Sequence, residues 1–126
     1  MASMVRIDRN ALEYFCTEVF ENLGLPREEA VDSASILVAA DARGIGSHGV
    51  GRLWRYVNGI KKQIMLGSAE PLVLTDTPIS LVLDAQGAMG MGLSMRTMGQ
   101  VIERAGLLGA SFASIRNSNH FGIAGY

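Results

Sequence analysis

The spacing of apolar residues changes near Gly67, and this change limits the chain to a mixed α+β fold. Before it, apolar residues recur at helical spacing, as in helices that bury one face. After it, apolar and β-branched residues gather in short runs separated by turn residues, which is typical of strands. We therefore predict a helical segment over residues 1–68 and the beginning of a sheet-containing domain over residues 69–126.

Two helices of the first segment have clear start and stop signals. Asp8 is a good N-cap for the first helix, and Gly24 ends it. Pro26 opens the second helix, which runs to about Arg43 and is ended by Gly44. Both helices have an apolar side, so we expect them to pack into a core.

The second segment alternates between strand and helix. Residues 72–75 and 79–83 are β-prone runs separated by Asp76-Thr77-Pro78, which predicts a hairpin. A helix is expected from about residue 93 to residue 105, and another strand over residues 110–115.

The glycine-rich stretch before that predicted helix has two interpretations. Gly87, Gly90 and Gly92 lie between a strand and a helix, where dinucleotide-binding folds hold phosphate. Their G-x-x-G-x-G spacing differs from the usual G-x-G-x-x-G, and Arg116 stands where a ribose-binding acid would be sought. A turn with close packing of helix on strand is therefore favoured. The alternative is a half-Rossmann nucleotide binder with a parallel βαβ unit, against which the hairpin containing Pro78 argues.

Composition excludes several classes of function. Eleven basic and twelve acidic residues give a net charge of -1, which provides no basic surface for nucleic acid or anionic lipid. No apolar run approaches the ~20 residues that span a bilayer. Cys16 lies in an apolar helical pattern, so we interpret it as a core residue in a reducing, cytoplasmic protein. One cysteine and two distant histidines do not make a metal site.

The two histidines, His48 and His120, both lie in polar turns flanked by glycine. Histidine is the side chain best suited to proton transfer near neutral pH. From the residues alone, a catalytic role and a structural role are equally supported for the pair.

Ser47 is a good N-cap for a third helix, predicted from His48 to about Lys62. A helix N-terminus suits an anionic ligand. Arg52 and Tyr56 follow His48 at intervals of four residues, which would place a proton donor, a carboxylate clamp and a hydroxyl along one helix face. The alternative is a solvated helix face with an ordinary serine cap.

Two stretches resemble the signatures of the type 2 malate/L-lactate dehydrogenases. The first is Ala-Asp-Ala-Arg-Gly-Ile-Gly-Ser-His-Gly-Val-Gly-Arg-Leu over residues 40–53, followed by Tyr56, and the second covers residues 117–126. That family includes malate, sulfolactate and ureidoglycolate dehydrogenases, diketogulonate reductase, and piperideine and pyrroline carboxylate reductases. The resemblance implies an NAD- or NADP-dependent oxidoreductase that transfers hydride reversibly at C2 of a small 2-oxo or 2-hydroxy acid. A cyclic-imine carboxylate reductase and a non-catalytic interaction module are the alternatives.

The resemblance also implies roles for single residues. Ser47 and His48 match a relay that a later aspartate completes, with the histidine giving or taking the proton. Arg52 matches the residue that binds the substrate carboxylate, and Tyr56 is assigned to the same substrate site. His120 matches a histidine beside the nicotinamide that is the catalytic base in some members. The expected cofactor contacts on a largely antiparallel, non-Rossmann sheet are His120, Phe121, Gly122, Ile123 and Ala124.

This sequence departs from the family pattern at two positions and in length. Gly46 replaces the aspartate usual in the first signature, and Trp54 replaces a common proline. Because the chain is much shorter than its relatives, we expect the relay aspartate and most cofactor contacts in the remainder of the same protein or in a second chain. We expect the assembled protein to be a homodimer and this chain alone to be inactive.

Overall fold

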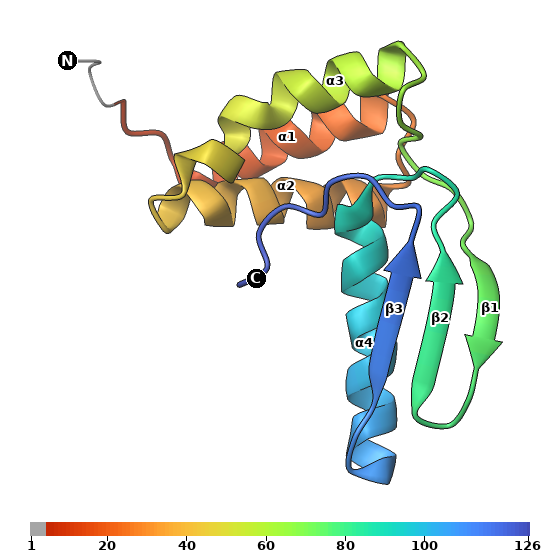
Figure 1. Ribbon diagram of the computed structural model, residues 1–126. Coiled ribbons are helices and arrows are strands. Elements are labelled where there is room, and N and C mark those ends of the chain that lie inside the picture. Colours follow the sequence, from red (N-terminus) through yellow and green to blue (C-terminus); the bar gives the residue numbers. More distant parts are fainter. Residues whose placement is uncertain (1–4) are drawn as a thin grey trace.

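The computed structural model describes residues 5–126, and its helices precede its sheet as the change near Gly67 predicts. The elements are α1 (Arg9–Asn22), α2 (Arg27–Ala42), the 3-10 turns η1 (Gly46–His48) and η2 (Val50–Arg52), α3 (Leu53–Lys61), β1 (Leu72–Asp76), β2 (Ser80–Asp84), α4 (Gly90–Leu108) and β3 (Phe112–Arg116). Figure 1 shows α1, α2 and α3 packed together at one end, with α4 running from them along the sheet. The α+β fold is confirmed. The boundary between residues 68 and 69 falls in the connection from α3 to β1 and stays a prediction.

The ends of α1 and the start of α2 follow the sequence signals. The Asp8 carboxylate accepts the N–H of Ala11 at 2.9 Å, and Gly24 follows α1 with a φ of +91°. Pro26 precedes α2 directly. Between the two helices, Cys16 is fully buried, and burial raises the pKa of its thiol to about 11. The interpretation of Cys16 as a core residue is confirmed.

The third helix begins later than predicted, because the backbone breaks at Gly49. The single helix expected over residues 48–62 is instead η1, η2 and then α3. Gly49 is extended, with φ −86° and ψ −160°, so helical hydrogen bonding cannot pass through it. The Asp41 carboxylate accepts the N–H of Val50 at 2.8 Å, while Ser47 makes no cap hydrogen bond. The prediction that Ser47 caps this helix was wrong.

The sheet is mixed, in the order β1-β2-β3. β1 and β2 form the predicted antiparallel hairpin, whereas β2 and β3 are parallel and connected through α4. The argument that the hairpin excludes a parallel βαβ unit was wrong, because β2 pairs with a different strand along each of its edges. Leu81 and Leu83 of β2 pack against Leu93 of α4 in a small second core.

The glycine-rich stretch is a packing turn. The N–H groups of Gly87 and Gly90 donate to the carbonyls of Asn117 and His120, so neither is free for a phosphate. A Cβ on Gly90 would lie 2.6 Å from the carbonyl oxygen of Asn119. The favoured interpretation is confirmed, and α4 begins at Gly90, earlier than predicted.

Gly92 allows α4 to approach α2 closely, and this close approach can be tested. A Cβ there would lie 2.9 Å from the Cβ of Glu29, whose carboxylate pairs with Arg96 at 2.9 Å. We expect Gly92→Ala to destabilise the protein by about 1–3 kcal/mol through overpacking. Gly99→Ala is the matched control: a Cβ there meets nothing within 4 Å, and alanine is the better helix former, by about 0.5–1 kcal/mol. In thermal unfolding, we expect Gly92→Ala to lower the melting temperature and Gly99→Ala to raise it. Equal shifts in melting temperature would contradict the close approach of α4 to α2.

Candidate active site

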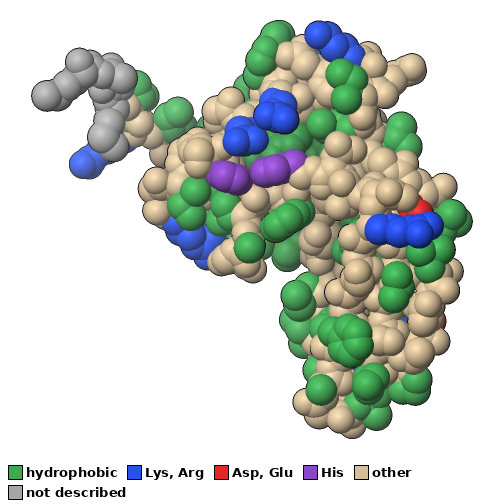
Figure 2. Space-filling view, viewed as in Figure 1, with side chains coloured by type: hydrophobic (Ala, Val, Ile, Leu, Met, Phe, Trp, Pro, Cys, Tyr) green, Lys and Arg blue, Asp and Glu red, His purple; other side chains and the backbone are tan. Residues whose placement is uncertain are grey.

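The two histidines, far apart in sequence, stack on each other. The ring centroids of His48 and His120 are 5.3 Å apart, with an angle of 30° between the ring planes. His48 ends η1, and His120 lies in the segment after β3. Figure 2 shows the two rings adjacent at the surface. Two groups suited to proton transfer therefore face one small volume.

The loop that carries His48 is held from α2. The Asp41 carboxylate accepts the Val50 N–H, and Gly49 is buried against that carboxylate. Ser47 Oγ lies 2.9 Å from His48 Nδ1. The serine therefore fixes the ring through Nδ1 and leaves His48 Nε2 without a partner among the described residues.

His120 is held at its Nδ1 by two groups. The N–H of Gly122 donates to this atom at 3.2 Å, and the Tyr56 hydroxyl lies 2.8 Å from it. Because a backbone N–H can only donate, Nδ1 is an acceptor, and the Tyr56 hydroxyl also donates to it. The neutral His120 ring therefore carries its proton on Nε2.

The surroundings keep His120 neutral and Tyr56 protonated. Burial lowers the pKa of His120, and the positive charges of Arg52, His48 and Arg55 lower it further. Burial raises the pKa of Tyr56, which is 1% exposed. The hydrogen bond between Tyr56 and His120 is thus a contact between two uncharged groups.

Arg52 lies beside this pair but not on one helix face with it. His48 and Arg52 belong to separate 3-10 turns, and Tyr56 points into the core, so the predicted shared helix edge was wrong. The Arg52 Nε donates to the carbonyl of Ser47. Arg52 forms no ion pair within residues 5–126. Figure 2 shows basic side chains along one flank of the histidines and no acidic side chain next to them.

The segment after His120 borders an apolar cavity of about 330 Å³. Its lining residues are Ile36, Ser94, Met95, Met98, Phe121, Ile123, Ala124 and Tyr126. Gly122 lies beneath this lining: it is buried, with a φ of +89°, and a Cβ there would lie 2.3 Å from Ile36 Cγ2. The cavity can accept a flat, ring-sized group next to His120, so its residues fit the nicotinamide end of a cofactor.

Comparisons with known proteins show the family of this chain. The family model described as malate/L-lactate dehydrogenase matches residues 7–126. The chain belongs to the malate/L-lactate dehydrogenase family. The malate dehydrogenase of Pyrococcus abyssi is 39% identical over 97% of this chain and 34% of its own length. The L-sulfolactate dehydrogenase of Methanocaldococcus jannaschii is 34% identical over 86% of this chain and 32% of its own length.

A solved structure in this dehydrogenase family has the same fold as the chain. The malate dehydrogenase of Pyrococcus horikoshii superposes with a TM-score of 0.93 at 38% identity, over 97% of this chain and 35% of its own. The chain described here therefore spans about a third of the length of the relatives that it matches.

The structure brings together five of the residues predicted from the sequence and adds three neighbours that were not predicted. Ser47, His48, Arg52, Tyr56 and His120 come together, joined by the contacts above. Asp41, Gly49 and Arg55 were missed. Asp41 and Gly49 lie inside the quoted first signature, but their contact joins distant positions that no local pattern reveals.

Two other sequence predictions can be compared with the described residues. No cluster of three or more metal-ligating side chains occurs within residues 5–126. None of the helices in that range is both long and apolar enough to cross a membrane.

Proposed function

We propose that this chain supplies the histidine and arginine part of an NAD- or NADP-dependent oxidoreductase. The reaction is reversible hydride transfer at C2 of a small 2-oxo or 2-hydroxy acid such as malate or lactate. The observation that carries the proposal is the stacked His48–His120 pair beside Arg52, which has no counter-ion within residues 5–126. It is supported by the relatives named malate dehydrogenase and L-sulfolactate dehydrogenase.

Arg52 binds the substrate carboxylate in this proposal. A guanidinium holds a carboxylate through two parallel hydrogen bonds, which fixes the orientation of C2. The carboxylate then lies against the histidine pair, so the C2 oxygen can reach an imidazole. Phe121, Ile123 and Ala124 would hold the nicotinamide, which when bound supplies or accepts the hydride.

The hydrogen bonds at the two rings favour different roles for the histidines. We assign His48 the tautomer that donates Nδ1–H to Ser47 Oγ, 2.9 Å away, because its free Nε2 can then take the proton of the hydroxy acid or return it to the oxo acid. Neutral His120 accepts at Nδ1 and donates Nε2–H to the C2 oxygen, which polarises the carbonyl. Tyr56 acts through His120 as a positioning residue, without itself contacting substrate.

The remaining parts of the enzyme are also proposed. By analogy with the relatives, the relay aspartate and the other cofactor contacts come from the polypeptide that corresponds to the other two-thirds of their length. We call the two parts together the complete enzyme. The same proposal includes assembly as a homodimer, which the family resemblance suggests. It also includes a cytoplasmic location, which the buried free thiol of Cys16 suggests.

The test is product formation by the complete enzyme. It is incubated with NADH or NADPH and with pyruvate, oxaloacetate or a cyclic-imine carboxylate in separate reactions. We expect consumption of one cofactor together with the matching 2-hydroxy acid. Reduction of the imine alone would assign the enzyme to cyclic-imine reduction, and no reduction of any substrate would favour a non-catalytic module.

The role of Tyr56 predicts a change in pH dependence. The pKa of His120 is lower than that of an ordinary histidine, so the ring stays neutral to a lower pH. We expect the enzyme to stay active to a lower pH for the same reason. Removing a donor to Nδ1 makes protonation of the ring easier. In Tyr56→Phe we therefore expect the acidic limb of kcat/KM, measured in the oxidation direction, to move to higher pH. Tyr14→Phe, a change at an exposed tyrosine on α1, is the control and should leave the limb in place. An unmoved limb in Tyr56→Phe would contradict the role.

A further inference from the structure

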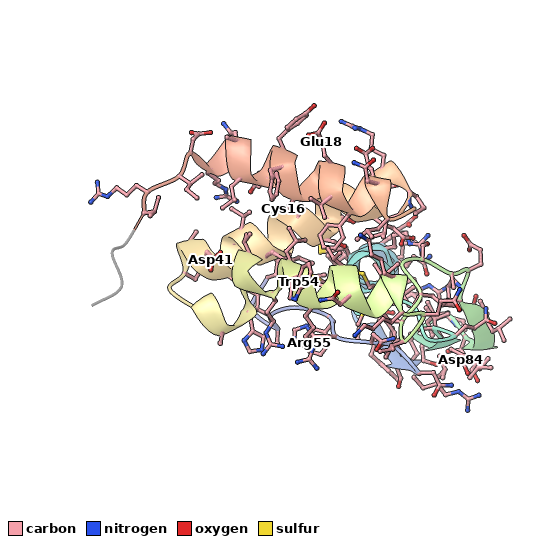
Figure 3. All side chains as sticks on the ribbon, turned by 90° about the horizontal axis from the view of Figure 1, so that it is seen from above. Cys16, Glu18, Asp41, Trp54, Arg55 and Asp84 are labelled. Carbon is pink, nitrogen blue, oxygen red and sulfur yellow. The ribbon has the colours of Figure 1, made fainter. Side chains whose placement is uncertain are left out.

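Arg55 is a second cation beside the histidines and also lacks a counter-ion among residues 5–126. It follows Arg52 by three positions, in the first turn of α3, so the two side chains leave neighbouring points of the helix surface. Arg55 is exposed. Figure 3 shows it on the side of α3 next to the C-terminal segment.

Most of the other arginines among residues 5–126 have a partner. Carboxylates pair with Arg9, Arg27, Arg96, Arg104 and Arg116. Arg43 lies over the ring of Tyr126, 5.9 Å from its centroid. Within the described residues, Arg52 and Arg55 have no carboxylate partner, and neither do Arg6 and Arg43. Of these four arginines, Arg52 and Arg55 are the two whose charges act on His120. Unneutralised guanidiniums that converge on a site favour an anionic ligand.

The charge of Arg55 reaches the reacting groups. It contributes to the lowered pKa of His120, together with burial and the charges of Arg52 and His48. It also opposes the rise that burial causes in the pKa of Tyr56. The cavity assigned above to the nicotinamide is lined from α2, α4 and the C-terminal segment, with no residue from α3. Arg55 therefore belongs to the substrate side of the histidines.

We propose that Arg55 is a specificity-determining residue that binds a second anionic group at the far end of the substrate. The inference rests on the proposed function, in which Arg52 holds the carboxylate at C1. A substrate with a carboxylate or sulfonate at each end then meets both guanidiniums, whereas a monocarboxylate meets only Arg52. The site therefore selects dianionic 2-oxo and 2-hydroxy acids.

The test compares two substrates in the complete enzyme. A charge-assisted hydrogen bond contributes about 1.5–3 kcal/mol, so Arg55→Gln should lower kcat/KM for oxaloacetate by about 10–100-fold. For pyruvate, which lacks the second carboxylate, kcat/KM should change by less than about threefold, within the effect of a surface substitution. Arg55→Lys should restore part of the preference for oxaloacetate, because it keeps the charge but loses the planar fork. Calorimetric affinity for malonate, an unreactive dicarboxylate, should fall in parallel in Arg55→Gln.

Lys62→Gln, at the far end of α3, is the matched loss of one positive charge and should leave the ratio of the two substrates unchanged. Equal losses for oxaloacetate and pyruvate would overturn the role of Arg55 while leaving the proposed function intact. A change confined to the KM of the cofactor would also overturn it, by assigning Arg55 to a cofactor phosphate. If the unaltered enzyme reduces neither acid, the proposed function fails, and the inference fails with it.

Discussion

Replacing His120 with alanine is expected to lower kcat/KM of the complete enzyme by about 10²–10³-fold, the range for loss of one positioned hydrogen-bond donor to an oxygen that gains charge in the transition state. The residue loses its Nε2–H donor, and His48 loses the ring stacked on it. Steady-state rates with saturating cofactor and varied 2-oxo acid measure the effect. Ser118→Ala, in the same polar segment, is the control. A rate within about threefold of the unaltered enzyme would remove His120 from the reaction.

Part of the effect of His120→Ala is structural and can be separated. The Tyr56 hydroxyl is buried and donates to His120, so losing the ring leaves it unpaired at a cost of about 1–3 kcal/mol. The double variant His120→Ala/Tyr56→Phe removes both partners and should recover much of that stability. It should recover none of the rate, because the Nε2–H that donates a hydrogen bond to the C2 oxygen is still absent.

The two histidines should also be non-additive. If His48 and His120 act on one C2 oxygen, the double variant His48→Ala/His120→Ala loses much less than the product of the single losses. If the loss of kcat/KM in the double variant equals the product of the two single losses, the two rings serve independent steps.

Gly49→Ala is expected to have the second large effect, although Gly49 contacts no reacting group. A Cβ there would lie 1.8 Å from Asp41 Oδ1, so the carboxylate must move and give up the N–H of Val50. We expect a stability loss of about 1–3 kcal/mol from overpacking. Displacing His48 by about 1 Å should lower kcat by roughly 10²-fold.

The chain offers two controls for this position. Gly51→Ala lies two residues further on, where a Cβ meets nothing within 4 Å, and should leave the rate and the melting temperature close to unaltered values. Asp41→Ala/Gly49→Ala removes the clashing group and should melt at a higher temperature than Gly49→Ala. A double variant no more stable than Gly49→Ala would show that the contact with Asp41 is not the cause.

Local signals predicted much of the fold, while long-range contacts decided the rest. Asp8, Gly24 and Pro26 act within one helical turn, so the sequence predicted their effects correctly. The late start of α3 depends on Asp41, which reaches Val50 from the preceding helix. The parallel pairing of β2 with β3 likewise depends on α4 returning the chain to the free edge of β2.

The candidate site divides in the same way. The polar turns flanked by glycine left a catalytic and a structural role equally supported for the two histidines, and the family resemblance of the two motifs made Ser47, His48 and His120 the predicted centre. Tyr56 was predicted on an exposed helix face, but it is buried because the helix starts late and turns that side chain toward Phe20 and His120. Arg55 was missed because a single arginine on a helix is usually a solvated charge. Its position near His120, with no carboxylate partner among residues 5–126, is visible only in the folded structure.

Whether Arg52 and the histidines act on a 2-oxo acid can be decided from the rate of cofactor oxidation by the complete enzyme. The unaltered enzyme is compared with Arg52→Ala and His48→Ala, using pyruvate and oxaloacetate as substrates. We expect oxidation that depends on the acid, with kcat/KM at least about 100-fold lower in each variant. Full rates in both variants would contradict it.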